Sequence, residues 1–339
     1  MIDLLKRLCN AKGVSGREDS ICSLISDEMK PLSDNVYIDK NNNVIAQVGN
    51  VQKHNIMLDA HLDEIGFVVT YIDDKGFLKA SPCGGMDMRV IPDTRFKVIT
   101  DSGEITAVSC CMPPHLSDGG EDKAPSPDSI YLDTGLSADK VKEIVSLGDT
   151  VSFDVTPSAL LNNRFSCCCT DNRAGCAVLI RVAQMIKENP VNSGVTFAFS
   201  SQEETFGKGA MTAAFELFPD EAVCVDVSFA MQSGVSPSES GELDKGGMIC
   251  ISPVLSKDMY KKLTELAKEN DIPYQYEVTG GITGTNADKI SVTRSGIPTA
   301  VVSVPQRNMH TNAEIISIND IEYVSRLIYE YIKACCKGE

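Results

Sequence analysis

The sequence contains no tryptophan, only four histidines among its 339 residues, and no long apolar run. A bilayer-spanning helix needs about 20 predominantly apolar residues, so we expect no transmembrane segment. No basic segment followed by an uninterrupted apolar stretch opens the chain, which argues against a signal peptide. Basic stripes are missing as well, and the net charge of −16 disfavours nucleic acid and anionic membranes as partners. The expected location is the cytoplasm.

The cysteines argue against a disulfide framework, although thirteen are present. No C-x-x-C pair occurs, which leaves a zinc ribbon or a thioredoxin-like motif without support. Many cysteines are adjacent, as in Cys110-Cys111, Cys167-Cys168-Cys169 and Cys335-Cys336, and adjacent cysteines rarely bridge productively. We therefore expect reduced cysteines that act mainly as small core hydrophobes.

The length and the apolar content of 42% permit either two domains or one domain that carries a large insertion. After residue 160, strand-like and helix-like segments alternate, which predicts an α/β fold with a mostly parallel sheet flanked by helices. The expected strands there are 194–200, 222–227, 247–252, 274–278 and 299–304, and the expected helices are 173–188, 209–218, 257–270, 287–295 and 318–337.

Residues 1–65 are expected to join this sheet, because they are too few to fold alone. They contain a helical pattern from Ile21 to Met29, which Ser15 could cap, and the expected strands 36–38, 44–48 and 55–60. Residues 66–160 instead show short strand-like runs separated by turn signals such as Asp73-Asp74-Lys75-Gly76. The pattern predicts an α/β domain formed by 1–65 and 161–339, interrupted by an all-β module at 66–160. Within this module, the polar residues 115–129 are expected to form a mobile loop.

Side chains able to bind metals recur where the predicted strands end. They are His61 and Asp63 after 55–60, Glu203 and Glu204 after 194–200, Asp226 near the end of 222–227, His310 after 299–304, and Asp171 just before the helix 173–188. Parallel strands present their ligands at their carboxyl ends, so these side chains should share one edge of the sheet. Imidazole and carboxylate groups together suit a dinuclear zinc-type site. A glutamate beside a ligand, but not itself bound, would act as the general base.

Each of these residues also has an ordinary structural explanation. Asp171 could be an N-cap, the pair Glu203-Glu204 a solvated turn, and His61 and Asp63 a local hydrogen-bonded pair. Asp226 is harder to explain in this way, because an unpaired carboxylate at the end of a buried strand is costly. Taken together, the residues favour a metal site over several unrelated local features.

These segments resemble, in the same order, the motifs of the TET-type aminopeptidases, the glutamyl and deblocking aminopeptidase family whose older label is endoglucanase. The matching segments are His61-Leu62-Asp63-Glu64-Ile65-Gly66-Phe67 for H-x-D-E-[IV]-G-F, Thr170-Asp171-Asn172-Arg173-Ala174-Gly175 for L-D-[DN]-R-x-G, Gln202-Glu203-Glu204 for Q-E-E, Asp226-Val227 for D-V, and Arg307-Asn308-Met309-His310-Thr311 for R-Y-x-H-[ST]. Pro113-Pro114-His115-Leu116 also resembles a segment of the family's inserted β domain. A single motif is weak evidence of kinship, whereas the ordered set is highly specific.

The resemblance implies a metal-dependent aminopeptidase that removes N-terminal residues from short peptides through water activated by two divalent metal ions, Zn²⁺ or Co²⁺. It implies that one ion binds His61, Asp171 and Asp226, and that the other binds Asp171, Glu204 and His310. Glu203 would be the catalytic base, and Asp63 would orient His61. The implied fold is a zinc-peptidase-like α/β domain with an inserted β-rich dimerisation domain. Family members form homo-oligomers, with dimers as building blocks and dodecamers as the usual assembly.

The sequence departs from the family pattern at Phe206, Asn286 and Asn308, where Gly, Asp and Tyr are usual. None of these is a predicted ligand, so we expect them to affect substrate preference rather than the chemistry. Three alternatives stay open. A glycoside hydrolase using Glu203 and Glu204 would leave the other residues without a role, and the chain has no tryptophan for stacking sugars. The others are a metallohydrolase of N-acyl amino acids and a non-catalytic binding subunit.

Overall fold

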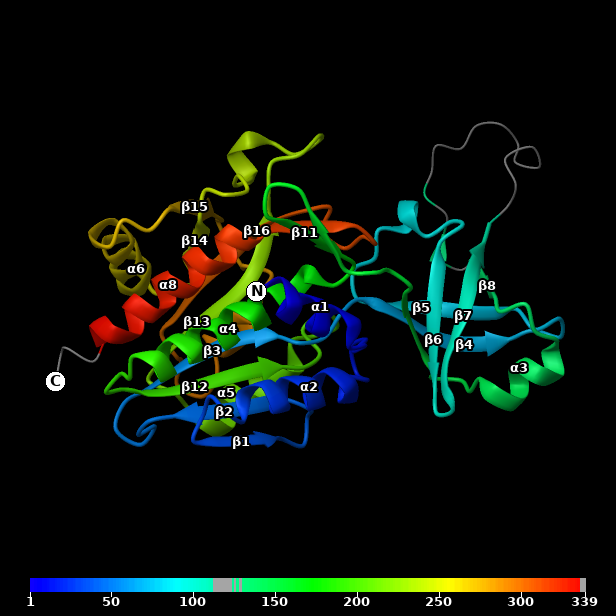
Figure 1. Ribbon diagram of the computed structural model, residues 1–339, viewed down its shortest axis with the longest axis horizontal. Helices are drawn as coiled ribbons and strands as arrows, with labels where there is room; N and C mark the ends of the chain where they lie inside the picture. The colour runs from blue at the N-terminus through cyan, green and yellow to red at the C-terminus, as the bar shows by residue number, and fades with distance from the viewer. Residues whose placement is uncertain (112–123, 125, 128–129, 336–339) are drawn as a thin grey trace.

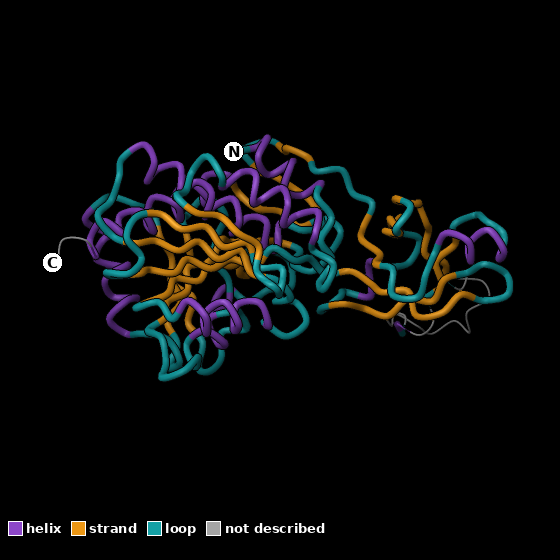
Figure 2. The backbone as a smooth tube through the Cα atoms, turned by 90° about the horizontal axis from the view of Figure 1, so that it is seen from below, coloured by secondary structure: helices purple, strands orange, loops and turns teal. Residues whose placement is uncertain are grey.

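The computed structural model describes residues 1–111, 124, 126–127 and 130–335 of the chain (Figure 1). An α/β body is built on an eleven-stranded sheet, and a smaller closed β-barrel projects from one end of it (Figures 1 and 2). The expected mobile loop at 115–129 lies outside the described residues apart from 124, 126 and 127. Pro113-Pro114-His115-Leu116 and the last two residues of the helix expected at 318–337 lie outside them as well.

The large sheet is mixed, with a parallel centre. Its order is β1-β2-β12-β3-β13-β16-β17-β11-β10, with β14 beside β16 and β15 beside β14. The bounds are β1 Asn35–Ile38, β2 Val44–Val48, β3 Asn55–His61, β10 Ser158–Leu160, β11 Arg164–Cys167, β12 Gly194–Ser200, β13 Glu221–Phe229, β14 Gly247–Ile251, β15 Tyr274–Val278, β16 Thr299–Arg307 and β17 Glu314–Ser317. The four central strands β12, β3, β13 and β16 run parallel to one another. Their carboxyl ends therefore meet at one edge, as the sequence predicts.

Helices cover both faces of this sheet (Figure 2). One face packs against α1 (Ile2–Asn10), α2 (Asp19–Met29), α4 (Thr170–Glu188) and α8 (Ile318–Cys335), and the other against α5 (Lys208–Leu217) and α7 (Ala287–Ile290). Side chains alternate between the two faces along a strand. In β13, Val223 and Val225 belong to the core on the α4 side, whereas Ala222 and Cys224 belong to the core on the α5 side. Asp226 shares the parity of Ala222 and Cys224. A further helix, α6 (Lys257–Glu269), packs near α8 and β14.

The barrel closes in the order β4-β5-β8-β7-β6-β9, and every neighbouring pair is antiparallel. Its strands are β4 Gly66–Ile72, β5 Leu78–Cys83, β6 Arg95–Thr100, β7 Gly103–Cys110, β8 Tyr131–Asp133 and β9 Thr150–Phe153. The buried ring of Phe96 stacks on Phe153 at 5.0 Å and meets the edge of Phe67 at 5.6 Å between centroids. Closure gives each of the six described strands a neighbour on both sides. The described residues of the module also include the α-helix α3 (Ala138–Ile144).

Three local expectations differ from the structure. Helix α1 was not expected, yet Leu4, Leu5 and Leu8 are buried along one side of it, which is an amphipathic pattern in a segment of nine residues. Helix α2 begins at Asp19, and the hydroxyl of Ser15 lies 2.9 Å from that of Thr205 instead of capping the helix. Helix α7 ends at Ile290, because a turn closed by hydrogen bonds replaces the last residues of the expected helix 287–295. None of the described helices is long and apolar enough to cross a membrane.

Candidate metal centre

The predicted site residues converge at the carboxyl edge of the four central strands. His61 is the last residue of β3, Glu203 and Glu204 follow β12, Asp226 lies in β13 and His310 follows β16. Asp171 enters from the start of α4, where its backbone is extended (φ −82°, ψ 106°) rather than helical. The local reason for this arrangement is that polar residues replace the apolar run near the carboxyl ends of these strands, at the end of β3 in His61 and three residues before the end of β13 in Asp226.

Asp171 lies at the centre of the cluster and faces a histidine with each of its oxygens. Its Oδ1 lies 3.1 Å from Nε2 of His61, and its Oδ2 lies 3.3 Å from Nε2 of His310. On the first side, Oδ1 of Asp226 is 3.7 Å from the same nitrogen of His61. On the second side, Oε2 of Glu204 is 3.6 Å from that of His310. The result is two groups of three ligand-type residues that share one carboxylate, the atoms of each group lying within 4.8 Å of one another.

This buried cluster holds more carboxylates than imidazoles, and burial and mutual repulsion act on the pKa values of these carboxylates. Asp171 and Asp226 are buried, and burial raises the pKa of Asp226 well above its usual range, with Asp171 adding to the rise and His61 opposing it. Burial likewise raises the pKa of Glu204, and the charge of Asp171 raises it further. For Asp171 burial also acts upward, but the hydrogen bonds from His310 and His61 hold its pKa well below its usual range. Two histidines thus face several carboxylates, a set that fits divalent cations.

Glu203 lies beside the ligand-type groups and is more accessible than all of them except His310. Its Oε2 is 4.0 Å from Nε2 of His61, and 17% of its side chain is exposed. Burial raises the pKa of Glu203 to about 7, an effect that Asp63 and Asp171 reinforce and His61 opposes. A carboxyl group with a pKa near neutrality is suited to taking up and returning a proton.

Asp63 does more than lie next to His61. Its Oδ1 is 3.4 Å from Nδ1 of the imidazole, although the pair does not have hydrogen-bond geometry. The same carboxylate accepts the backbone N–H groups of Glu203 at 3.0 Å and of Glu204 at 3.1 Å. Asp63 therefore links the loop after β3 to the loop after β12 and fixes the backbone position of both glutamates.

Sequence reasoning missed Glu314, which supports the centre from behind. Its buried carboxylate accepts hydrogen bonds from the backbone N–H groups of Asp171 and His310, and from the side chains of Thr170 and Gln306, at 3.0 Å each. It thereby joins the start of α4 to the segment after β16. No motif marks this residue, and its nearness to His310 in the chain is the sole signal that could have drawn attention to it.

The three departures from the family pattern do not line the cavity at the centre. Asn286 is buried and donates hydrogen bonds to Asp59 at 2.9 Å and Ser200 at 2.8 Å. Phe206 is exposed, with the ammonium of Lys289 4.5 Å from its ring centroid, and Asn308 donates to a backbone carbonyl. The cavity itself has a volume of about 280 Å³, and its walls include the predicted ligands and Glu203, together with Ser228, Phe229, Glu277, Thr285 and Met309.

Comparison with known proteins defines the class to which this fold and site belong. The model of the M42 glutamyl aminopeptidase family matches residues 42–327. A putative aminopeptidase of Acetivibrio thermocellus is 35% identical over 339 residues, covering 98% of each chain. An aminopeptidase of the archaeon Desulfurococcus kamchatkensis has a TM-score of 0.92 at 30% identity, covering 100% of this chain and 98% of that one. The TET1 peptidase of Pyrococcus horikoshii, which assembles into a tetrahedron or a large octahedral shell, has a TM-score of 0.86 at 30% identity, covering 97% and 98%.

The chain is thus an aminopeptidase, a peptide hydrolase with the TET peptidase fold. It belongs to the M42 glutamyl aminopeptidase family, which confirms the resemblance read from the motifs. The glycoside hydrolase alternative has no support, because the carboxylates of Glu203 and Glu204 lie within 4.8 Å of each other and of a ring nitrogen of His61 rather than on opposite sides of a cleft. Membership of the family also argues against a non-catalytic binding subunit.

Proposed function

We propose that this aminopeptidase acts with two divalent metal ions, Zn²⁺ or Co²⁺, held in a shared site. His61, Asp171 and Asp226 would bind one ion, and Asp171, Glu204 and His310 would bind the other. The observation that carries the proposal is Asp171, whose two oxygens face the two histidines at 3.1 Å and 3.3 Å. A carboxylate in this position can bridge two cations and offset their repulsion. Bound ions would supply a Lewis acid that polarises a peptide carbonyl and lowers the pKa of a water molecule.

The protein side chains would then move the proton. Glu203, whose pKa lies near neutrality, would take a proton from water at its carboxylate and return it to the amine that leaves the cleaved bond. Asp63 would act as a positioning residue, because it holds the backbone of Glu203 and Glu204 and lies beside the imidazole of His61. Its negative charge would also favour the ring tautomer that leaves Nε2 free.

We further propose that residues 1–65 and 161–339 form the catalytic domain, together with strand β10, which pairs with β11 in the large sheet, and that the rest of residues 66–160 form an inserted domain that pairs subunits. The separate barrel supports this division, and so does the fact that no proposed ligand comes from its strands (Figure 1). The assembly of the related TET1 peptidase supports a homo-oligomer. Enclosed assemblies admit short peptides, which we propose as the substrates. The cytoplasmic location stays a prediction.

Removal of metal tests the central proposal. Purified protein dialysed against EDTA should lose the hydrolysis of aminoacyl-anilides, and Zn²⁺ or Co²⁺ should restore it, with two ions bound per chain by elemental analysis. A mock dialysis without chelator serves as the control. Anilide hydrolysis that persists after exhaustive chelation would refute the proposal. Hydrolysis of N-acyl amino acids without any aminoacyl-anilide cleavage would favour the acyl-amino-acid hydrolase instead.

A further inference from the structure

A carboxylate outside the proposed ligand set lines the catalytic cavity. Glu277, in β15, is partly buried, and its oxygens accept hydrogen bonds from the hydroxyls of Ser228 at 2.7 Å and Ser303 at 3.2 Å. No described lysine, arginine or histidine forms an ion pair with it. Two serine hydroxyls hold the carboxylate in place without neutralising its charge, so the charge is left for a ligand.

The sheet register fixes Glu277 close to the metal centre. Ser303 lies directly opposite Asp226 on the neighbouring parallel strand, and Ser228 follows Asp226 by two residues on the same face of β13. Adjacent strands are about 4.8 Å apart, and a step of two residues along a strand covers about 6.6 Å. Glu277 therefore lies about one side chain's length from a residue that we propose as a metal ligand.

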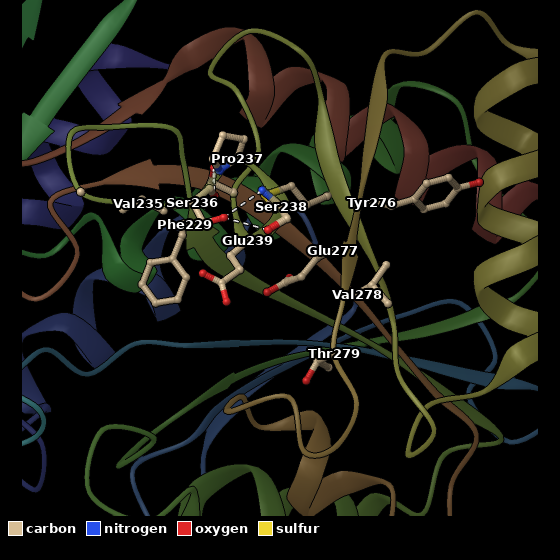
Figure 3. A pocket seen from close by; sticks show the side chains of 13 residues that line it. Phe229, Val235, Ser236, Pro237, Ser238, Glu239, Tyr276, Glu277, Val278 and Thr279 are labelled. Carbon is tan, nitrogen blue, oxygen red and sulfur yellow. Dashed lines mark hydrogen bonds between the residues drawn. The ribbon is translucent and has the colours of Figure 1, made fainter.

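A second cavity extends from this point away from the metal centre. Its volume is about 540 Å³, and it shares Phe229 and Glu277 with the catalytic cavity. In the close-up, the carboxylates of Glu239 and Glu277 project into the same space, with Phe229 to one side and Val278 to the other (Figure 3). None of the described residues that line either cavity is lysine or arginine. The walls thus offer both apolar surface and negative charge where the two cavities meet.

We propose that Glu277 is a specificity-determining residue that binds the cationic end of a basic N-terminal side chain, so that the enzyme prefers peptides that begin with lysine or arginine. The inference rests on the proposed function and names its substrate class. Lysine and arginine side chains lay their methylene stems on apolar surface and keep the charge at the tip, and both cavities offer the ring of Phe229 together with the carboxylate of Glu277. Glu239 adds negative charge farther out. An acidic N-terminal side chain would be repelled, and a neutral one would leave Glu277 without a counter-charge.

Steady-state kinetics with metal-loaded enzyme on the anilides of lysine, arginine, leucine and glutamate test the inference. We expect kcat/KM for the lysine and arginine anilides to exceed that for the leucine anilide at least tenfold, and the glutamate anilide to be the poorest substrate. In Glu277→Gln, the lysine-to-leucine ratio of kcat/KM should fall at least tenfold, mainly through KM, because a hydrogen bond between charged partners is lost. Glu239→Gln should lower the ratio less.

Glu242→Gln is the matched control, since this glutamate is exposed and lines neither cavity. It should retain the wild-type ratio. A wild-type enzyme that cleaves the leucine or glutamate anilide better than the lysine anilide would overturn the specificity while leaving the aminopeptidase function intact. A parallel loss on all substrates in Glu277→Gln would overturn it as well. Metal-loaded enzyme that cleaves none of the anilides would overturn both the specificity and the proposed function.

Discussion

At the scale of single residues, the surroundings of each carboxylate in the centre determine its role. Asp171 faces two imidazoles, which hold its pKa low and keep it ionised. Glu203 has only one such neighbour at 4.0 Å, and burial raises its pKa to about 7, with the charges of Asp63 and Asp171 adding to the rise. A ligand must stay ionised, whereas a proton carrier must change its state. The environment therefore assigns the two roles to these two residues.

The first residue-scale prediction concerns this proton carrier. Glu203→Gln keeps the size of the side chain and removes its ability to take a proton, so kcat should fall by about two to four orders of magnitude. Both metals should remain bound, because the five proposed ligands are unchanged. Discontinuous assays of anilide hydrolysis measure kcat, and elemental analysis measures the metal bound per chain. Glu265→Gln, the same exchange at an exposed position of α6, should match the wild type. Near-normal turnover, or empty metal sites, in Glu203→Gln would contradict the assignment.

At the scale of elements, the centre depends on where strands end and on what ties those ends together. Glu314 opens β17 and holds the start of α4 through Thr170 and Asp171, while it also binds the backbone of His310. One carboxylate thus fixes the positions of residues from both proposed metal groups. Burial raises the pKa of Glu314 well above its usual range, with the charge of Asp171 adding to the rise.

We therefore predict that Glu314→Gln loosens both metals. The amide places a donor where the structure needs an acceptor, and changes behind a metal site typically cost 10- to 100-fold in affinity or activity. Competition with a fluorescent chelator should show weaker binding of both ions, while circular dichroism shows the fold retained. Glu265→Gln again provides the comparison. Wild-type affinity for both ions in the Glu314 variant would show that this residue does not position the site.

The same scale shows what the sequence could predict. Strands β12 and β15 match their expected bounds, because a buried apolar run in β12 and alternating aromatic and polar residues in β15 are local patterns. His61, Glu203 and Asp226 were found because each lies at or after the end of such a run. Glu314 and Glu277 could not be found in this way. Their roles depend on which strands become neighbours, through the contacts of β17 with β16 and of β15 with β14, and such long-range pairing leaves no mark in the local pattern.

At the scale of the whole molecule, the barrel projects from one end of the α/β body (Figure 1), and it exposes aromatic side chains. Tyr71 and Tyr131 are 54% and 37% exposed, and both pair in register with Lys79 on the strand between them. They therefore lie on one face of the barrel, where a closed sheet would otherwise be expected to present polar groups. Aromatic residues of this kind are enriched where subunits meet. This face is a suitable contact with a second copy of the chain.

We predict that the purified protein is a homo-oligomer of at least two 36.6 kDa chains, and that Tyr131→Glu shifts it towards smaller species. A charge buried between subunits without a partner costs several kcal/mol, which is enough to dissociate an ordinary contact. Light scattering coupled to size exclusion gives the mass of each species. Lys75→Glu places the same charge in the exposed turn between β4 and β5 and should leave the mass unchanged. A wild-type protein that is a stable monomer and still trims peptides would refute the predicted assembly. Cleavage of a folded protein at an internal bond would refute the restriction to free N-termini.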